Sequence, residues 1–205
     1  MLNQLIQLFL LALASVIVMI LHELPKSIIY TKLYNIHNNS NKRNIFALDQ
    51  YIDPIGLIFC ITNLTGFSKP YVYRLNNKKM NRTLAITGYA SLLFVFFISI
   101  GVVNFMNINY GTSQINEVSL LIGMVFSFFL YMATVSMGML LVNLFPIATF
   151  DMGLLVASIS SEKYYSIISN DYFIKMILIL AVIFGFVSNL AIFILNIFIM
   201  GSTLI

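Results

Sequence analysis

Long apolar runs alternate with short polar segments along the whole chain. Four of these runs are long enough to cross about 30 Å of hydrocarbon, which takes ~20 residues of α-helix. Because their interiors hold almost no charged residues, we predict that all four are membrane-spanning helices. The predicted spans are Leu2–Leu24, Leu84–Phe105, Val118–Phe145 and Phe173–Met200.

A fifth apolar stretch, Ile52–Phe67, has a different pattern. It is too short to span comfortably, and it contains Pro54, Gly56 and Gly66 among frequent β-branched and aromatic residues. Irregular backbone at membrane depth requires protein or water to satisfy its polar groups. We therefore predict a re-entrant element or a β-hairpin that packs against the helices.

Composition supports a chain that is embedded in a lipid bilayer. Of its 205 residues, 60% are hydrophobic and only 9% are charged, whereas a soluble domain carries about 25% charged residues. We predict one all-α integral membrane domain over residues 1–205. The net charge of +4 comes from cations in loops between apolar runs, which form no basic face, so we expect no nucleic-acid partner. The one cysteine, Cys60, excludes an internal disulfide and a cysteine-rich metal site.

The positions of the basic residues predict the orientation. Nine of the eleven Lys and Arg precede residue 83, and the loop Met106–Glu117 has none. The positive-inside rule then places 25–83 and 146–172 in the cytoplasm and both termini outside. We expect a multi-pass protein of the cell membrane.

Four ionisable residues fall near the predicted cytoplasmic face. His22 and Glu23 end the first span, Lys26 follows one turn later, and Asp151 comes just after the third span. An ionisable group at membrane depth costs roughly 2.5–3.5 kcal/mol and is usually paired and functional. The alternative is that these are ordinary interfacial charges that reach to water.

The spacing of these residues favours a chemical role. Residues 22–26, His-Glu-Leu-Pro-Lys, occupy the frame of the H-E-x-x-H motif. In that motif two histidines on one helix face bind zinc, and the glutamate is the general base. A catalytic zinc takes three protein ligands and holds a water, whose pKa it lowers, in the fourth position.

Three more segments, in order along the chain, strengthen the pattern. They are Ile-Asp-Pro-Ile-Gly at 52–56, Gly-Phe-Ser-Lys-Pro-Tyr-Val at 66–72, and Asn-Leu-Phe-Pro at 143–146 with Asp151 five residues after the proline. With the 22–26 segment, they resemble the site-2 protease family of intramembrane zinc metalloproteases (peptidase family M50). The resemblance covers roughly residues 15–160. It implies an α-helical membrane fold and hydrolysis of peptide bonds within or beside a transmembrane segment.

The resemblance also implies roles for individual residues. His22 and Asp151 would be zinc ligands, and Glu23 would be the general base. Asn143 would position the substrate or the loop that carries Asp151. The implied partner is the transmembrane helix of a substrate or of another membrane protein.

The chain departs from the family pattern at several positions. Lys26 replaces the second histidine, and a protonated amine has no lone pair for a metal. Pro25 removes a backbone donor and is expected to kink or end the helix. Of the family's Gly-Pro-x-x-Asn segment only Gly88 remains, with Tyr89 and Leu92 at the other two positions.

These departures suggest a change in chemistry. We predict that the ammonium group of Lys26 replaces the zinc charge by pairing with Glu23 and Asp151. His37, in the polar loop 31–44, is the only other histidine; it is either a substitute ligand or a solvated loop residue.

Three functions remain open. The chain is an active metalloprotease with an unusual ligand set, a non-catalytic relative that binds transmembrane helices or regulates a partner, or an unrelated small membrane subunit that carries the motifs by chance. We favour a site-2-protease-like pseudoprotease whose activity is lost or altered.

Overall fold

The computed structural model describes residues 2–33, 44–70, 77–110 and 120–202. These residues form helices and, within the described ranges, no strand. The helices are α1 (Leu2–Leu33), α2 (Pro54–Asn63), α3 (Lys78–Tyr110), α5 (Leu120–Asn143), α6 (Asp151–Ile159), α7 (Ser161–Ile183) and α8 (Phe186–Ser202), with a 3-10 turn at Leu48–Tyr51.

Four helices are long and apolar enough to cross a membrane: Asn3–Lys32, Lys78–Asn109, Leu120–Asn143 and Ser161–Ile183. For the described residues, the prediction of a helical protein with about four helices of membrane-spanning length is therefore confirmed. Three of the predicted spans fall within or close to α1, α3 and α5.

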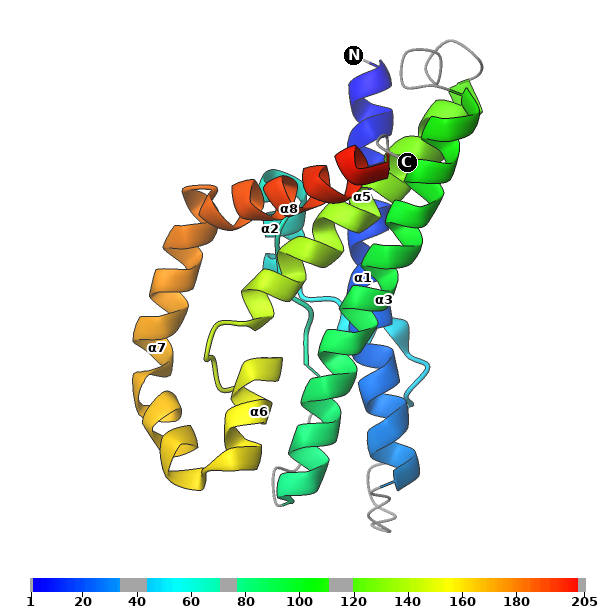
Figure 1. Ribbon diagram of the computed structural model, residues 1–205. Helices are drawn as coiled ribbons and strands as arrows, with labels where there is room; N and C mark the ends of the chain where they lie inside the picture. The colour runs from blue at the N-terminus through cyan, green and yellow to red at the C-terminus, as the bar shows by residue number, and fades with distance from the viewer. Residues whose placement is uncertain (1, 34–43, 71–76, 111–119, 203–205) are drawn as a thin grey trace.

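The fourth predicted span has different boundaries. The apolar run 173–200 is not one helix, because α7 ends at Ile183 and α8 begins at Phe186. Gly185 between them has φ of 73°, a left-handed conformation that only glycine adopts without steric cost. The chain turns there, and α8 runs across the upper part of α5 (Figure 1). The helix that could span the membrane instead begins earlier, at Ser161.

The β-hairpin considered for 52–67 does not form. Residues Pro54–Asn63 are a helix whose N-cap, Asp53, accepts hydrogen bonds from two backbone N–H groups of the first turn. Pro54 occupies the first helical turn, where no N–H is needed. The helix ends at Leu64, which has φ of 57°. The β-branched residues that suggested a strand are thus outweighed by a complete helix start.

The glycines of this element allow the chain after α2 to return against it. A Cβ on Gly66 would lie 2.2 Å from the carbonyl oxygen of Gly56, and one on Gly56 would lie 1.9 Å from that of Phe67. Only glycine permits such a close approach. The extended residues that follow α2 therefore lie directly against the start of that helix.

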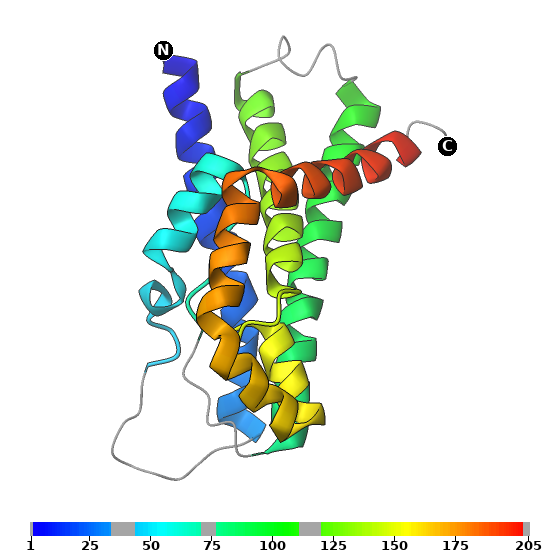
Figure 2. The same ribbon diagram turned by 90° about the vertical axis from the view of Figure 1, so that its left-hand side faces the viewer.

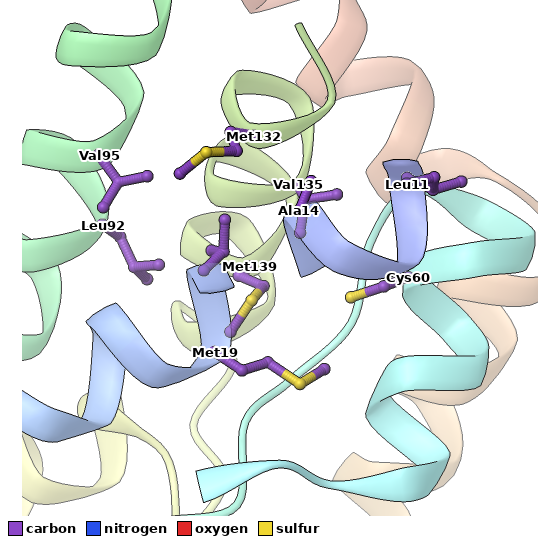
Figure 3. Close-up of a cluster of buried hydrophobic side chains, with 10 residues drawn as sticks. Leu11, Ala14, Met19, Cys60, Leu92, Val95, Met132, Val135 and Met139 are labelled. Carbon is purple, nitrogen blue, oxygen red and sulfur yellow. The ribbon is translucent and has the colours of Figure 1, made fainter. Parts of the chain in front are cut away.

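The helices α1, α3 and α5 pack side by side in both views (Figures 1 and 2). Their shared core is a cluster of buried apolar side chains that also includes Cys60 of α2 (Figure 3). Cys60 is buried and free, as expected for a small hydrophobic side chain. The cluster consists of Leu11, Ala14, Val18, Met19, Cys60, Leu92, Val95, Met132, Val135 and Met139.

Of the two outcomes expected at Pro25, a kink or a helix end, the helix end is wrong. The helix does not end at Pro25 but continues to Leu33 with the proline inside it. Beyond the proline, Ile29 and Tyr30 pack against a cluster of buried apolar side chains from α3 and α6. This packing offsets the hydrogen bond that Pro25 cannot donate. Lys26 therefore lies on the same continuous helix as His22.

Candidate functional site

Helix α1 carries three of the predicted site residues on one buried face. His22, Glu23 and Lys26 are each 2% exposed or less. Residues three and four apart on a helix lie on the same side, so the Lys26 side chain reaches back toward both His22 and Glu23. Because the three side chains are buried, they are not interfacial charges that reach to water.

Asp151 reaches the same place from a different part of the chain. Helix α5 ends at Asn143, a short turn follows, and Asp151 is the first residue of α6. A carboxylate in the first turn is favoured by the partial positive charge of a helix N-terminus. The Asp151 N–H donates to Asn143 Oδ1 at 3.5 Å, while Asn143 Nδ2 donates to the carbonyl of Met139. Asn143 thus braces the turn that carries Asp151.

Lys26 lies at the centre of the cluster. Its Nζ donates to Glu23 Oε1 at 2.7 Å and to Asp151 Oδ1 at 2.8 Å. The same Nζ lies 3.3 Å from His22 Nε2. One ammonium group therefore bridges two buried carboxylates from α1 and α6.

The imidazole of His22 is held on both sides. Its Nε2 lies 2.8 Å from Asp151 Oδ2, and its Nδ1 lies 2.8 Å from Ser68 Oγ. The Ser68 hydroxyl also lies 3.0 Å from Glu23 Oε1. Ser68 belongs to the extended segment after α2, so three separate parts of the chain meet in one hydrogen-bonded network.

Sequence reasoning missed Ser68. The residue lies inside the Gly66–Val72 segment that resembles the family, but nothing in that segment distinguishes its side chain from a solvated loop serine. Its role depends on the close return of the segment against α2, which places Ser68 at 5% exposure. The two glycines that permit the return were the only available indication.

The position of Gly88 explains how Asp151 fits against α3. A Cβ built on Gly88 would lie 2.2 Å from Asp151 Oδ2 and 2.5 Å from its Cγ. Gly88 is the one residue retained from the degraded family segment. Its missing side chain makes room for the carboxylate.

We predict that Gly88→Ala destabilises the protein by about 1–3 kcal/mol, because the added methyl displaces a carboxylate that Lys26 and His22 hold in place. Unfolding in mixed detergent micelles measures this. Gly101→Ala is the matched control: it lies on the same helix, and a Cβ there meets nothing within 4 Å. That change should be neutral or stabilising by up to about 1 kcal/mol. Equal effects of the two substitutions on stability would contradict the close contact between Gly88 and Asp151.

Tyr89 and Leu92 have structural roles in this chain. The Tyr89 hydroxyl donates to the carbonyl oxygen of Asn143 at 2.9 Å, which ties α3 to the end of α5. Leu92 is fully buried in the shared core. Both residues therefore support the elements that carry the cluster without entering it.

The electrostatics of the cluster keep Asp151 ionised. Burial by itself would raise the pKa of the carboxyl, but the positive charge of Lys26 and the interaction with His22 outweigh it and lower the pKa to about 2. A buried carboxylate that is hydrogen-bonded to an ammonium group and to an imidazole can keep its charge.

The residues of the cluster do not fit a catalytic zinc site. Zinc takes three protein ligands with lone pairs, whereas here the third ligand position beside His22 and Asp151 holds the Lys26 ammonium. The same ammonium occupies the Glu23 carboxylate through a hydrogen bond. Among the described residues, no group of three or more His, Cys, Asp and Glu is arranged to hold a metal. His37, the other candidate ligand, lies outside the described residues.

Comparisons with known proteins do not identify the chain. A scan against protein-family models, a search of curated proteins and a search of solved structures each gave no match. The fold and the site define a class: a multi-helix protein that is compatible with a multi-pass membrane location and has a buried charged cluster.

Proposed function

We propose that this chain is a site-2-protease-like membrane protein that has lost metal-dependent hydrolysis and keeps the scaffold for binding a transmembrane helix. The observation that carries the proposal is the position of Lys26 Nζ, within 2.8 Å of carboxylate oxygens of both Glu23 and Asp151. These are the residues that the family resemblance assigns to the general base and to a zinc ligand.

An ammonium group supplies the charge of the missing metal but not its chemistry. Two carboxylates buried side by side require a cation, and Lys26 provides one through two short hydrogen bonds. An ammonium nitrogen has no vacant coordination position, so it cannot bind a water and lower its pKa as zinc does. The scaffold then persists while the metal-activated water is lost.

The proposed partner is the transmembrane helix of another membrane protein. Helix α7 supports this, because only 11% of the residues in its apolar 18-residue stretch are buried. In the other three candidate spans the buried share is 33–39%. The exposed apolar side chains of α7 offer a surface to which a partner helix can bind. We further propose that the end of the molecule bearing Lys69, Lys78 and Arg82 faces the cytoplasm, since these cations are exposed there.

The proposal is tested by a cleavage assay in proteoliposomes with a single-span substrate helix. The wild-type protein should show no cleavage that a zinc chelator such as 1,10-phenanthroline abolishes. Chelator-sensitive cleavage should appear in Lys26→His, which completes the H-E-x-x-H motif. Chelator-sensitive cleavage by the wild-type protein, abolished by Glu23→Gln, would instead support an active metalloprotease.

A further inference from the structure

Ser68, His22 and Asp151 form a continuous chain of hydrogen bonds. Ser68 Oγ lies 2.8 Å from His22 Nδ1, and His22 Nε2 lies 2.8 Å from Asp151 Oδ2. With Nε2 protonated toward the aspartate, Nδ1 has a lone pair directed at the serine hydroxyl. A hydroxyl, a base and an acid that orients the base are the three parts of an activated nucleophile.

We propose that Ser68 is a nucleophile for acyl transfer, with a peptide carbonyl of a bound segment as its substrate. The inference rests on the proposed absence of zinc in one respect: a metal-bound His22 would have no free nitrogen to accept a proton. With Lys26 in place of the metal, both ring nitrogens are available to their neighbours.

The step is balanced without any further reactant except water. Ser68 Oγ bonds to the carbonyl carbon while its proton passes to His22 Nδ1. The C–N bond then breaks, and the leaving amine takes that proton from His22. Water hydrolyses the resulting ester by the same route and regenerates the hydroxyl.

Two features beside Ser68 suit acyl transfer: its backbone N–H and the exposed residue that follows it. Its own backbone N–H makes no hydrogen bond to any residue that the structure describes, so it is available to a developing oxyanion. The next residue, Lys69, is exposed, so the chain leaves the buried cluster for the surface within one residue of Ser68.

Glu23 is a second acceptor for the same hydroxyl hydrogen. Its Oε1 lies 3.0 Å from Ser68 Oγ, slightly farther than His22 Nδ1. The same oxygen accepts the Lys26 ammonium at 2.7 Å, which neutralises much of its charge. The imidazole is therefore the nearer acceptor and the one that no cation occupies through a short hydrogen bond.

A small organophosphorus fluoride tests the assignment on the purified full-length protein in detergent. The reagent bonds phosphorus to an activated serine oxygen and releases fluoride, and the serine proton passes to the base. We expect one adduct per chain by intact mass, located on Ser68 by peptide mapping. The absence of an adduct, or an adduct on a different serine, would overturn the proposal.

Two variants provide the controls. Ser68→Ala should lose the adduct. Ser15→Ala should keep it, because Ser15 is also buried, on α1, but its hydroxyl donates to the carbonyl of Leu11 and not to a histidine. An adduct that persists in folded Ser68→Ala would also refute the assignment, and peptide mapping of the wild-type adduct decides the matter if that variant does not fold. Zinc content, measured separately on the same samples, tests the proposed function independently.

Discussion

Lys26→Met should destabilise the protein by about 3–5 kcal/mol. The substitution keeps a side chain of similar length but removes the cation that bridges Glu23 and Asp151. Two buried carboxylates then lose the cation that they share, and a buried charge that loses its partner costs several kcal/mol. Reversible unfolding in mixed detergent micelles, followed by circular dichroism, measures the change.

Two comparisons separate this effect from a general effect of removing a lysine. Lys32→Met alters an exposed lysine at the end of the same helix and should change stability by less than about 0.5 kcal/mol. The triple variant Lys26→Met, Glu23→Gln, Asp151→Asn removes all three charges together and should recover most of the loss. A Lys26→Met protein as stable as the wild type would show that the ion pairs are absent.

Lys26→His should create a zinc site. The introduced imidazole lies four residues from His22 on the same helix face, and Asp151 already lies within hydrogen-bonding distance of His22. Three ligands with lone pairs then surround one point, as a catalytic zinc requires. We expect zinc affinity to rise by about 10³-fold or more, which corresponds to roughly 4 kcal/mol. Titration with zinc against a competing chelator dye measures it.

A substitution of Asp151 provides the control for this gain in zinc affinity. Adding Asp151→Asn to Lys26→His should remove most of the new affinity, because an amide is a far poorer zinc ligand than a carboxylate. If Lys26→His binds zinc no better than the wild type, the three side chains do not converge as described.

The spans were predictable because lipid imposes a simple rule. Apolar runs without charge have to be helical at membrane depth, and this sufficed for α1, α3 and α5. The same rule does not locate a break inside an apolar run. The turn at Gly185 depends on a left-handed glycine within a stretch of uniformly apolar residues, so the end of α7 and the start of α8 were missed.

The other two errors in the predicted fold arise where one feature of the sequence outweighs another. In Ile52–Phe67, β-branched residues suggested a strand, but the Asp53 cap and Pro54 start a helix. In α1, Pro25 suggested a kink or a helix end, but the helix continues to Leu33, and Ile29 and Tyr30 beyond the proline pack against a buried apolar cluster. In both cases a few specific contacts outweigh the average preference of the residues.

The cluster itself was partly predictable. Loop charges and motif spacing indicated that four ionisable residues lie at a similar depth in the membrane: His22, Glu23, Lys26 and Asp151. Their side chains do meet in the structure. Ser68 was not predictable, since its burial follows from the close approach of Gly56 and Gly66. When an irregular segment supplies a side-chain partner, that partner can be recognised only in the three-dimensional structure.

Metal analysis of the purified wild-type protein is the most direct test of the central claim that an ammonium group stands in for zinc. Protein purified without chelators and analysed by mass spectrometry of the elements should contain far less than one zinc per chain. Stoichiometric zinc that Asp151→Ala removes would contradict the claim, because it would show that Asp151 binds a metal ion and not the Lys26 ammonium.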